Sequence, residues 1–325
     1  MFDIEKVKNN LSLNITSVFL ELLFYDELIK NNSAQIEQTI DQVAIAKELV
    51  NSGIKTESYL LDFFTQMAQD SLNLVVSKNA YQSKLIDLIQ LLDIKDTHGF
   101  DIIIPKNLKL LPKANKAVDD YYNIALTVLP EIKSAQYRLQ NAESNVKYIK
   151  GNRLPSLSFE GYCGTNYSSN STLFNQHGEA IDYLYYNQLN DNINMYFGLR
   201  LTIPIFSRFS IRNSVNIAKI NSSKMATNIQ LTKQNVYQEV QKVYYDFIAA
   251  KEQMMFEKKL LDASELSFYH ANEKLKAGII SVYDYGTVKT QLIKVTSKYL
   301  QAKYKYIFKM KMLDFYTGVP ISLEN

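Results

Sequence analysis

The chain has 325 residues, enough for two ordinary domains, yet it contains only 10 glycines and 6 prolines, well below the usual shares of roughly 7% and 5%. The 36 lysines and arginines nearly balance the 33 aspartates and glutamates, without the dense basic cluster that follows a phosphate backbone. One cysteine and three scattered histidines exclude an intrachain disulfide and a structural zinc site. These observations argue against a nucleic-acid-binding protein and against a small protein stabilised by disulfides or a metal ion.

The proline positions predict where long helices lie. All six prolines fall between residues 105 and 204 or at residue 320, so residues 1–104 and 205–319 can each form uninterrupted helix. In the first of these stretches, Leu11, Ile15, Val18 and Leu22 recur at the spacing of one helical face, which predicts an amphipathic helix.

The two proline-free stretches are copies of one unit. At an offset of 225 residues, residues 11–93 match residues 236–318 without a gap, and Gly53, Gln66 and Leu88 fall on identical residues. Each copy has a long amphipathic helix, a glycine break and a second helix. The repeat therefore predicts two helical hairpins.

Each glycine break is a helix end followed by a helix start. Gly53 and Gly278 can adopt the left-handed conformation that terminates a helix. Thr56 and Ser281 follow them at the position of an N-cap, so we expect their side chains to cap the returning helices.

The segment between the hairpins has a different pattern of apolar and polar residues. Residues 102–104 form a short apolar run that predicts a strand in a small connecting segment, and residues 118–153 return to helical periodicity. From residue 157 and again from residue 192, apolar and polar side chains alternate, with a polar loop rich in Asn, Ser and Tyr over residues 167–191. Such alternation is typical of a transmembrane β-strand with one face towards lipid, although a soluble hairpin shows it too.

The sequence thus predicts a mainly α fold with a small β part, built from long antiparallel coiled-coil hairpins and transmembrane strands. No apolar run reaches the ~20 residues of a membrane-spanning helix. The expected divisions are 1–93 for the first hairpin, 94–117 for a connecting segment, 118–153 for a helix, 154–206 for two strands with a long loop, 207–318 for the second hairpin, and 319–325 for a tail.

Four motifs follow one another along the chain: RLPSLSFEGY from Arg153, LTIPIF from Leu201, AGIISVYDY from Ala277 and YKYIFKMKMLDFYTG from Tyr304. In this order, these motifs resemble the TolC family of outer-membrane efflux channels. The resemblance covers nearly the whole chain and implies a homotrimer whose chains share one barrel of strands in the outer membrane and one tunnel of helices, an α-barrel, in the periplasm. The family carries two repeats of helix, two strands and helical hairpin, so we expect the natural protein to be longer, with a signal peptide, a helix and two strands before the first hairpin.

The resemblance also implies a constriction at the hairpin tips. Family members narrow the tunnel with carboxylates on the returning helices, the first of them six residues after the glycine. Asp284 matches this position in the second repeat, where Tyr59 is its counterpart in the first. The acid three residues further on is present as Asp62, and Thr287 replaces it in the second repeat. Either a mixed ring of Asp284 and Asp62 favours cations, or each acid simply complements a helix dipole.

The exposed tips and the strands supply the remaining candidate residues. In the family the tips meet a periplasmic adaptor protein that connects to an inner-membrane pump, and the equivalent residues are Gly53, Ile54, Thr56, Gly278, Ile279 and Ser281. On the strands, Arg200 either tunes anion passage through the lumen or forms an ion pair with Glu160.

The sequence lacks the motifs of the common enzyme classes, including a P-loop, G-x-S-x-G and H-E-x-x-H. We therefore expect no catalysis, cofactor or bound metal, and a passive channel in the outer membrane whose cargo is drugs, metals or secreted proteins. The alternative is a soluble coiled-coil scaffold without pore activity.

Overall fold

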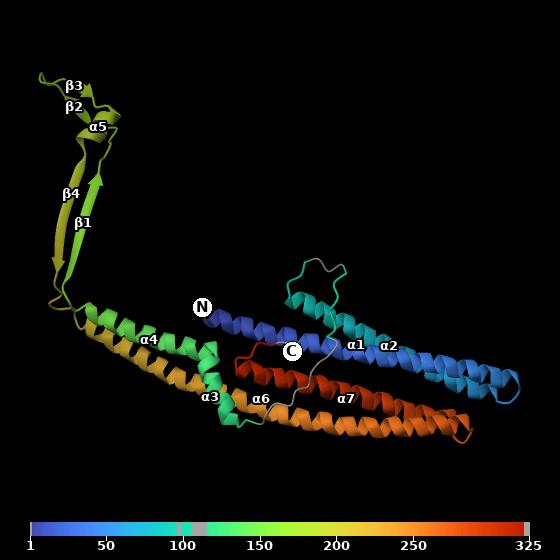
Figure 1. The fold of residues 1–325 in the computed structure, drawn as a ribbon. Helices are drawn as coiled ribbons and strands as arrows, with labels where there is room; N and C mark the ends of the chain where they lie inside the picture. The colour runs from blue at the N-terminus through green and yellow to red at the C-terminus, as the bar shows by residue number, and fades with distance from the viewer. Residues whose placement is uncertain (1, 96–98, 106–115, 322–325) are drawn as a thin grey trace. The chain divides into compact units, whose positions relative to one another are not determined.

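The chain folds as two units. The computed structural model describes residues 2–95, 99–105 and 116–321. One unit comprises Met1–Ala135 with Ile229–Asn325, and the other comprises Gln136–Asn228. The first unit is helical, and the second contains every strand of the described residues (Figure 1). The predicted mainly α fold with a small β part is confirmed.

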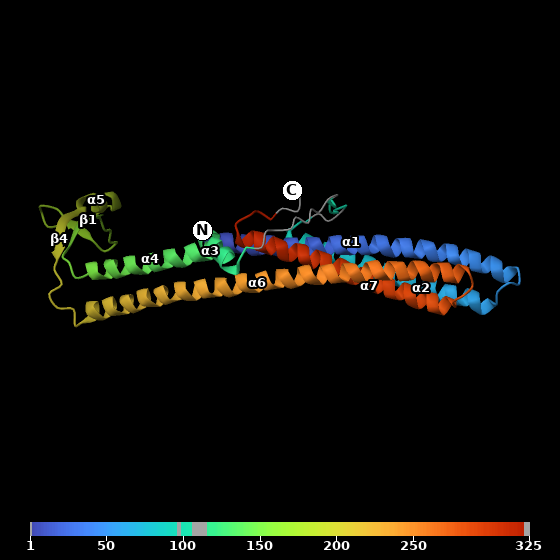
Figure 2. The ribbon, with the colours of Figure 1, turned by 60° about the horizontal axis from the view of Figure 1, so that its bottom comes forward.

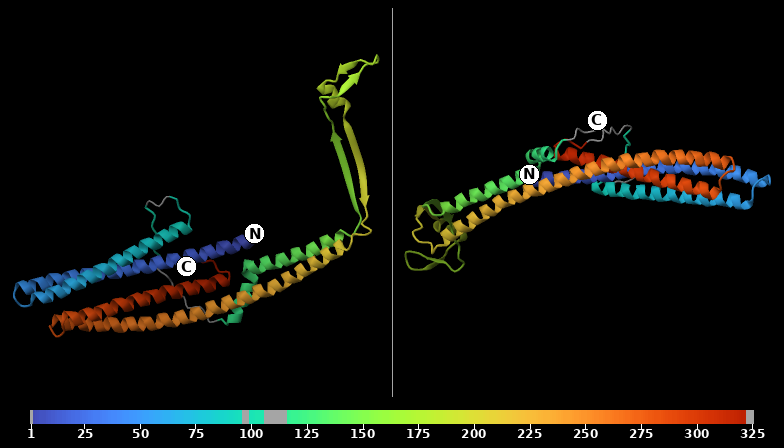
Figure 3. Two further views of the ribbon diagram at one scale, coloured as in Figure 1. Left: turned by 180° about the vertical axis from the view of Figure 1, so that it is seen from behind. Right: turned by 90° about the horizontal axis from the view of Figure 1, so that it is seen from below.

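Two antiparallel hairpins make up most of the helical unit. The first joins α1 (Phe2–Asn51) to α2 (Glu57–Leu91), and the second joins α6 (Ser210–Lys276) to α7 (Val282–Tyr316). Of α6, residues 229–276 belong to this unit. The helices of each hairpin lie side by side in every view (Figures 2 and 3). The helices α2 and α7 have 35 residues each, and they begin and end at positions that the sequence repeat makes equivalent.

Both hairpins turn at a left-handed glycine, as predicted. Gly53 and Gly278 each have a φ of 71°, a conformation that costs glycine little. The amide of Ile54 donates to the Leu49 carbonyl at 2.9 Å, and the amide of Ile279 donates to the Lys274 carbonyl at 2.8 Å. Both are the six-to-one hydrogen bond of a Schellman motif.

The two returning helices differ in their caps. The Ser281 hydroxyl accepts a hydrogen bond from the Asp284 amide at 3.0 Å and donates to the Asp284 carboxylate at 2.7 Å. Thr56 stands at the N-cap of α2 but makes no side-chain hydrogen bond there. The predicted cap is therefore correct for Ser281 and wrong for Thr56, because the Thr56 hydroxyl does not meet a backbone amide of the first turn.

The largest apolar cluster lies where α6 and α7 pack with α3 (Val118–Val128). Val240 and Leu313 are completely buried in it, and the rings of Phe247 and Tyr306 stack at 5.5 Å. This cluster covers the apolar stripe over the middle of α6 and the end of α7, and such burial of an apolar stripe stabilises long helices in water.

The helix predicted over residues 118–153 is instead two helices. α3 ends at Val128, and α4 (Pro130–Gly151) begins directly after Leu129, whose backbone is extended with a ψ of 130°. Proline disfavours the helical conformation in the residue before it and is well suited to the first position of a helix. Pro130 therefore ends one helix and starts the next.

The strand predicted at residues 102–104 is wrong. Residues 101–105 have no regular secondary structure, since no described segment pairs with them. Ile102 instead packs against the apolar clusters that α1 forms with α2 and with α7, whereas Ile103 is 88% exposed. The Tyr81 hydroxyl of α2 holds the segment by donating to the Asp101 carboxylate at 2.8 Å. Residues 96–98 and 106–115 of the connecting segment lie outside the described residues.

The second unit contains a long antiparallel pair of strands. β1 (Ser156–Gly164) pairs with β4 (Asn194–Thr202) along its whole length. The register places Leu157 opposite Leu201 and Phe159 opposite Leu199, so the apolar side chains of both strands share one face. Leu199 is 73% exposed, and this apolar face is therefore uncovered in the single chain.

The segment between these strands is more ordered than the predicted polar loop. It contains β2 (Thr172–Phe174), β3 (Ala180–Asp182) and the short helix α5 (Tyr185–Asp191). Buried Gln188 fixes it, since its side-chain amide donates to the Tyr183 carbonyl at 2.6 Å and its oxygen accepts from the Ser168 amide at 2.9 Å. In the part of the chain that the structure describes, no helix has the apolar length of a membrane-spanning helix.

Replacing Ser281 by alanine should lower the stability of the second hairpin by about 1 kcal/mol, because the first turn of α7 loses its cap. The expected readout is a lower thermal midpoint measured by circular dichroism. Thr56→Ala is the matched control and should leave the midpoint unchanged. Equal destabilisation by both substitutions would contradict the assigned caps.

Candidate functional site

The two hairpin tips are exposed parts of the helical unit. Both tips lie at the same end of this unit (Figure 1). Ile54 and Ile279, which directly follow the two turn glycines, are 66% and 71% exposed. An isoleucine therefore stands at the same exposed place in both repeats.

The acid of the second tip is held in a defined position. The Asp284 carboxylate accepts a hydrogen bond from the Ser281 hydroxyl at 2.7 Å, and its side chain lies on the exposed side of the first turn of α7. This position complements the positive end of the helix dipole. The same position presents a negative charge to solvent at the tip.

A groove of about 730 Å³ lies beside the tips, between α2 and α7. Asp62 and Thr287 both line it, together with Gln66, Tyr283 and Lys294. Gly286 leaves room for the Gln66 side chain, since a Cβ atom at this position would lie 2.9 Å from the Gln66 side-chain oxygen. The structure therefore brings together two of the four expected constriction residues.

The other two expected constriction residues, Tyr59 and Asp284, are not among those that line this groove. Asp284 is among the capping contacts described above. The Tyr59 ring packs edge-on against Phe63 at 5.3 Å, and the Lys55 ammonium lies 5.0 Å from its centroid. Burial raises the pKa of the Tyr59 hydroxyl, so this side chain stays neutral and contributes no charge.

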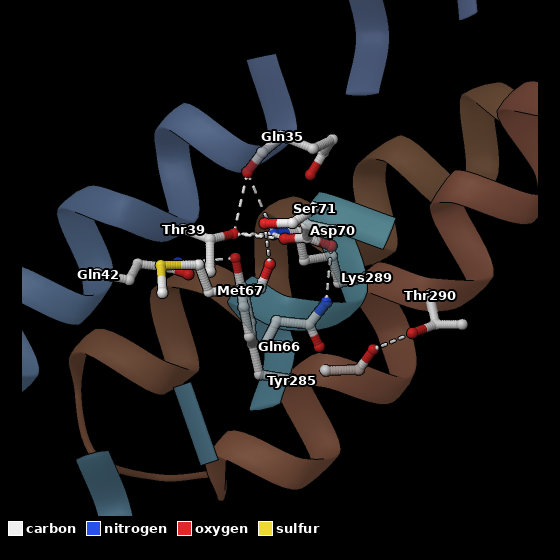
Figure 4. A network of polar contacts seen from close by, with 11 residues as sticks. Gln35, Thr39, Gln42, Gln66, Met67, Asp70, Ser71, Tyr285, Lys289 and Thr290 are labelled. Atoms are coloured by element: carbon white, nitrogen blue, oxygen red, sulfur yellow. Dashed lines mark hydrogen bonds and ion pairs between the residues drawn. The ribbon is translucent and has the colours of Figure 1, made fainter. Parts of the chain in front are cut away.

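A buried ion pair joins the two hairpins above the tips, and sequence reasoning missed it. The Lys289 ammonium of α7 donates to the Asp70 carboxylate of α2 at 2.7 Å, and the two side chains are 0% and 1% exposed. The Thr39 hydroxyl of α1 donates to the same carboxylate oxygen at 2.6 Å and accepts from Lys289. Figure 4 shows these side chains converging from three helices.

The rest of this network completes the hydrogen bonds of both ions. The Gln66 amide donates to the second Asp70 oxygen at 2.9 Å, and the Gln35 carbonyl accepts from Lys289 at 3.4 Å. Next to the pair, the Gln42 amide donates to the buried Tyr285 hydroxyl at 2.8 Å. Burial lowers the pKa of Lys289, and Asp70 opposes this effect.

One sequence signal pointed to this network. Val282, Tyr285, Lys289 and Leu292 follow one another at helical spacing and are all buried, so Lys289 is a charged residue on the apolar stripe of α7. A buried charge requires a partner of opposite sign, but helical spacing alone does not reveal which carboxylate supplies it.

The expected strand residues form an ion pair. Two nitrogens of the Arg200 guanidinium each lie 3.0 Å from one oxygen of the Glu160 carboxylate. Tyr162 and Tyr196 are paired on the same polar face, and each ring lies over a glycine two residues on, Gly164 and Gly198. Of the two expectations for Arg200, the structure contains the ion pair. Among the described residues, no cluster of His, Cys, Asp and Glu side chains could hold a metal ion.

Comparison with known proteins gives a consistent answer. The family model described as outer membrane efflux protein matches residues 121–319, which is more than half of the chain. Toxin and drug export protein A of Aggregatibacter actinomycetemcomitans is 22% identical over 316 residues, covering 94% of this chain and 63% of that protein. The chain therefore spans less than two thirds of the length of this exporter.

Solved structures of the same fold extend over almost the whole chain. The CmeC outer membrane channel of Campylobacter jejuni has a TM-score of 0.72 at 18% identity, covering 100% of this chain and 66% of CmeC. A membrane protein from Pseudomonas aeruginosa has a TM-score of 0.74 at 14% identity, covering 98% of this chain and 70% of that protein. The resemblance to the TolC family that the motifs indicated is confirmed. The chain thus belongs to the family of outer membrane efflux proteins and is a protein of the outer membrane.

Proposed function

We propose that this chain is a subunit of a trimeric outer-membrane channel, a passive conduit that exports cargo delivered by an inner-membrane pump through a periplasmic adaptor. One observation carries the proposal: β1 and β4 form a strand pair with one apolar and one polar face, in the same chain as two hairpins of very long helices. At 1.5 Å per residue, the 67 residues of α6 extend about 100 Å.

The strand pair supports a lipid-facing role. Its exposed apolar face matches the outward face of a membrane strand, and its polar face, with the Arg200–Glu160 pair, matches a water-filled lumen. Within the described residues, β1 and β4 pair only with each other, so their outer edges need strands from other copies or from elsewhere in the protein. This requirement favours a closed barrel to which this strand pair contributes, and the homotrimer is the assembly that the family resemblance implies.

The hairpin tips support contact with an adaptor. Ile54 and Ile279 present equivalent apolar side chains next to the turn glycines, and a trimer would repeat this pair three times around the tunnel mouth. The energy for export comes from the pump, because the chain has no nucleotide-binding motif.

The groove and the capped acid support a constriction that prefers cations. Asp62 lines the groove beside the tips and Asp284 lies on the first turn of α7, so a trimer would carry six carboxylates near its mouth. Thr287 contributes a polar, uncharged side chain to the same groove.

The related exporter is named for toxins and drugs, and polypeptides and small molecules are both proposed cargo.

The membrane role can be tested on the strand pair. Leu199→Asp should weaken insertion into lipid by up to about 2 kcal/mol, since it places a carboxylate on the apolar face. Ser158→Asp is the control, because it places the same carboxylate on the polar face, and this variant should insert normally. The measurement is the yield of detergent-dependent trimer from the membrane fraction. A native protein that is recovered in the water-soluble fraction, with the same yield for both variants, would instead favour the coiled-coil scaffold.

The constriction can be tested by conductance. Replacing Asp62 and Asp284 together by asparagine should reduce the preference for cations, measured as the reversal potential across a planar bilayer in a salt gradient, and should weaken block by divalent cations. Asp119→Asn, in the first turn of α3, is the control and should change neither property. Unaltered selectivity in the double variant would exclude both acids from the constriction.

A further inference from the structure

We propose that the buried Lys289–Asp70 pair sets the axial register of α7 against the first hairpin and thereby fixes the heights of the tip acids relative to each other. The register is a property of the fold itself. Its consequence for the constriction rests on the function proposed above.

The interface between α7 and the first hairpin is apolar at two places. Near the tips, Ala46 and Phe63 pack with Val282. Further along, Leu20 and Leu23 pack with Tyr304 and Ile307. Apolar contacts are non-directional, so similar side chains at helical spacing would also meet after a shift of one turn. These clusters alone therefore select a register weakly.

The contact between these two clusters is polar and directional. An ammonium group has three donors and no acceptor, and Lys289 directs its ammonium towards three oxygens, on Asp70, Thr39 and the Gln35 backbone. These oxygens come from two helices, so they define one position for the ammonium rather than a path along one helix.

No other axial position offers an equivalent partner. Among the described residues the buried carboxylates are Asp70 and Asp314, and Asp314 lies on α7 itself. Further along the hairpin, Asn32 and Ser77 are buried but already bond to each other at 2.9 Å. A slip of one turn, about 5.4 Å, would leave a buried ammonium and a buried carboxylate unpaired, which is strongly unfavourable.

This register determines which tip residues stand at the same height. Asp62 precedes Asp70 by eight residues on α2, or about 12 Å, and Asp284 precedes Lys289 by five residues on α7, or about 8 Å. Because both helices run away from the tips, the pair holds the two acids within about 5 Å of each other along the helix direction. Lys289 and Asp70 are thus positioning residues for the constriction.

The test is a distance measurement between the two helices. Nitroxide labels on Ser58→Cys and Lys298→Cys, both exposed and far apart along the helices, should give one narrow distance by double electron–electron resonance. Cys163 is first replaced by serine, and the labelled chain is diluted with unlabelled chain in detergent. The variant Lys289→Met with Asp70→Leu leaves no unpaired charge and should fold, but with a broadened distribution or a second distance shifted by about 5 Å.

The chain offers a matched control on the same helices. Lys303 and Glu27 also join α7 to α1, with the ammonium and carboxylate 2.8 Å apart, but this pair is partly exposed. Lys303→Met with Glu27→Leu should retain one narrow distance. If the first double variant does not fold, Lys289→Met with Asp70→Asn replaces it, since asparagine preserves the shape of the side chain.

The outcomes separate the register from the function. One narrow, unshifted distance in the folded Lys289/Asp70 variant would overturn the inference. A shifted distance in a protein that forms no conducting pore would support the register and count against the proposed channel. A shifted distance together with altered cation selectivity would support both.

Discussion

Helices of 35 to 67 residues with one apolar stripe each depend on the partner that covers the stripe. In the second hairpin, α6 and α7 bury a continuous apolar cluster that includes Val240 and Leu313. Between the hairpins the apolar clusters are smaller and interrupted, and a fully buried ion pair fills the interval. The packing of α7 on the first hairpin therefore combines two kinds of interaction, one that supplies stability and one that supplies position.

This division of roles follows from the energetics of buried charge. The pairing of Lys289 with Asp70 offsets a large desolvation cost, so an apolar pair of similar volume could be equally stable. The charged pair differs from an apolar pair in being specific, because a slip of one turn would leave both ions without an equivalent buried partner. Thr39 increases this specificity, since it bonds to the carboxylate from α1. Gln66 lies one turn before Asp70 on α2 and satisfies the second carboxylate oxygen.

In the strand pair, by contrast, the apolar surface is not covered by the chain itself. Its apolar face, with Leu199 and Phe159, is exposed in the single chain, and an uncovered apolar surface of this kind requires a lipid or protein partner. Such a face is unfavourable in water and favourable in a bilayer, which accords with membership of an outer-membrane family. The same alternation that leaves this face uncovered also places Arg200 and Glu160 together on the polar face.

Much of the fold could be predicted because it depends on local rules. The absence of proline from two long stretches, the glycines at residues 53 and 278 and the period-two alternation from residue 192 determined the hairpins, their turns and the long strands. Local rules also explain one error, since Pro130 marks a helix boundary that the longer apolar periodicity concealed.

The remaining features depend on contacts between distant segments. The sequence marked Thr56 and Ser281 equally, yet only Ser281 meets a backbone amide, because a cap requires exact local geometry. Among the described residues no strand pairs with the apolar run at residues 102–104, and Ile102 packs on the helices instead. The sequence by itself determined the elements and the faces they expose. Only the tertiary structure decided that Lys289 pairs with Asp70, because the choice of partner depends on which two helix surfaces meet and at what height.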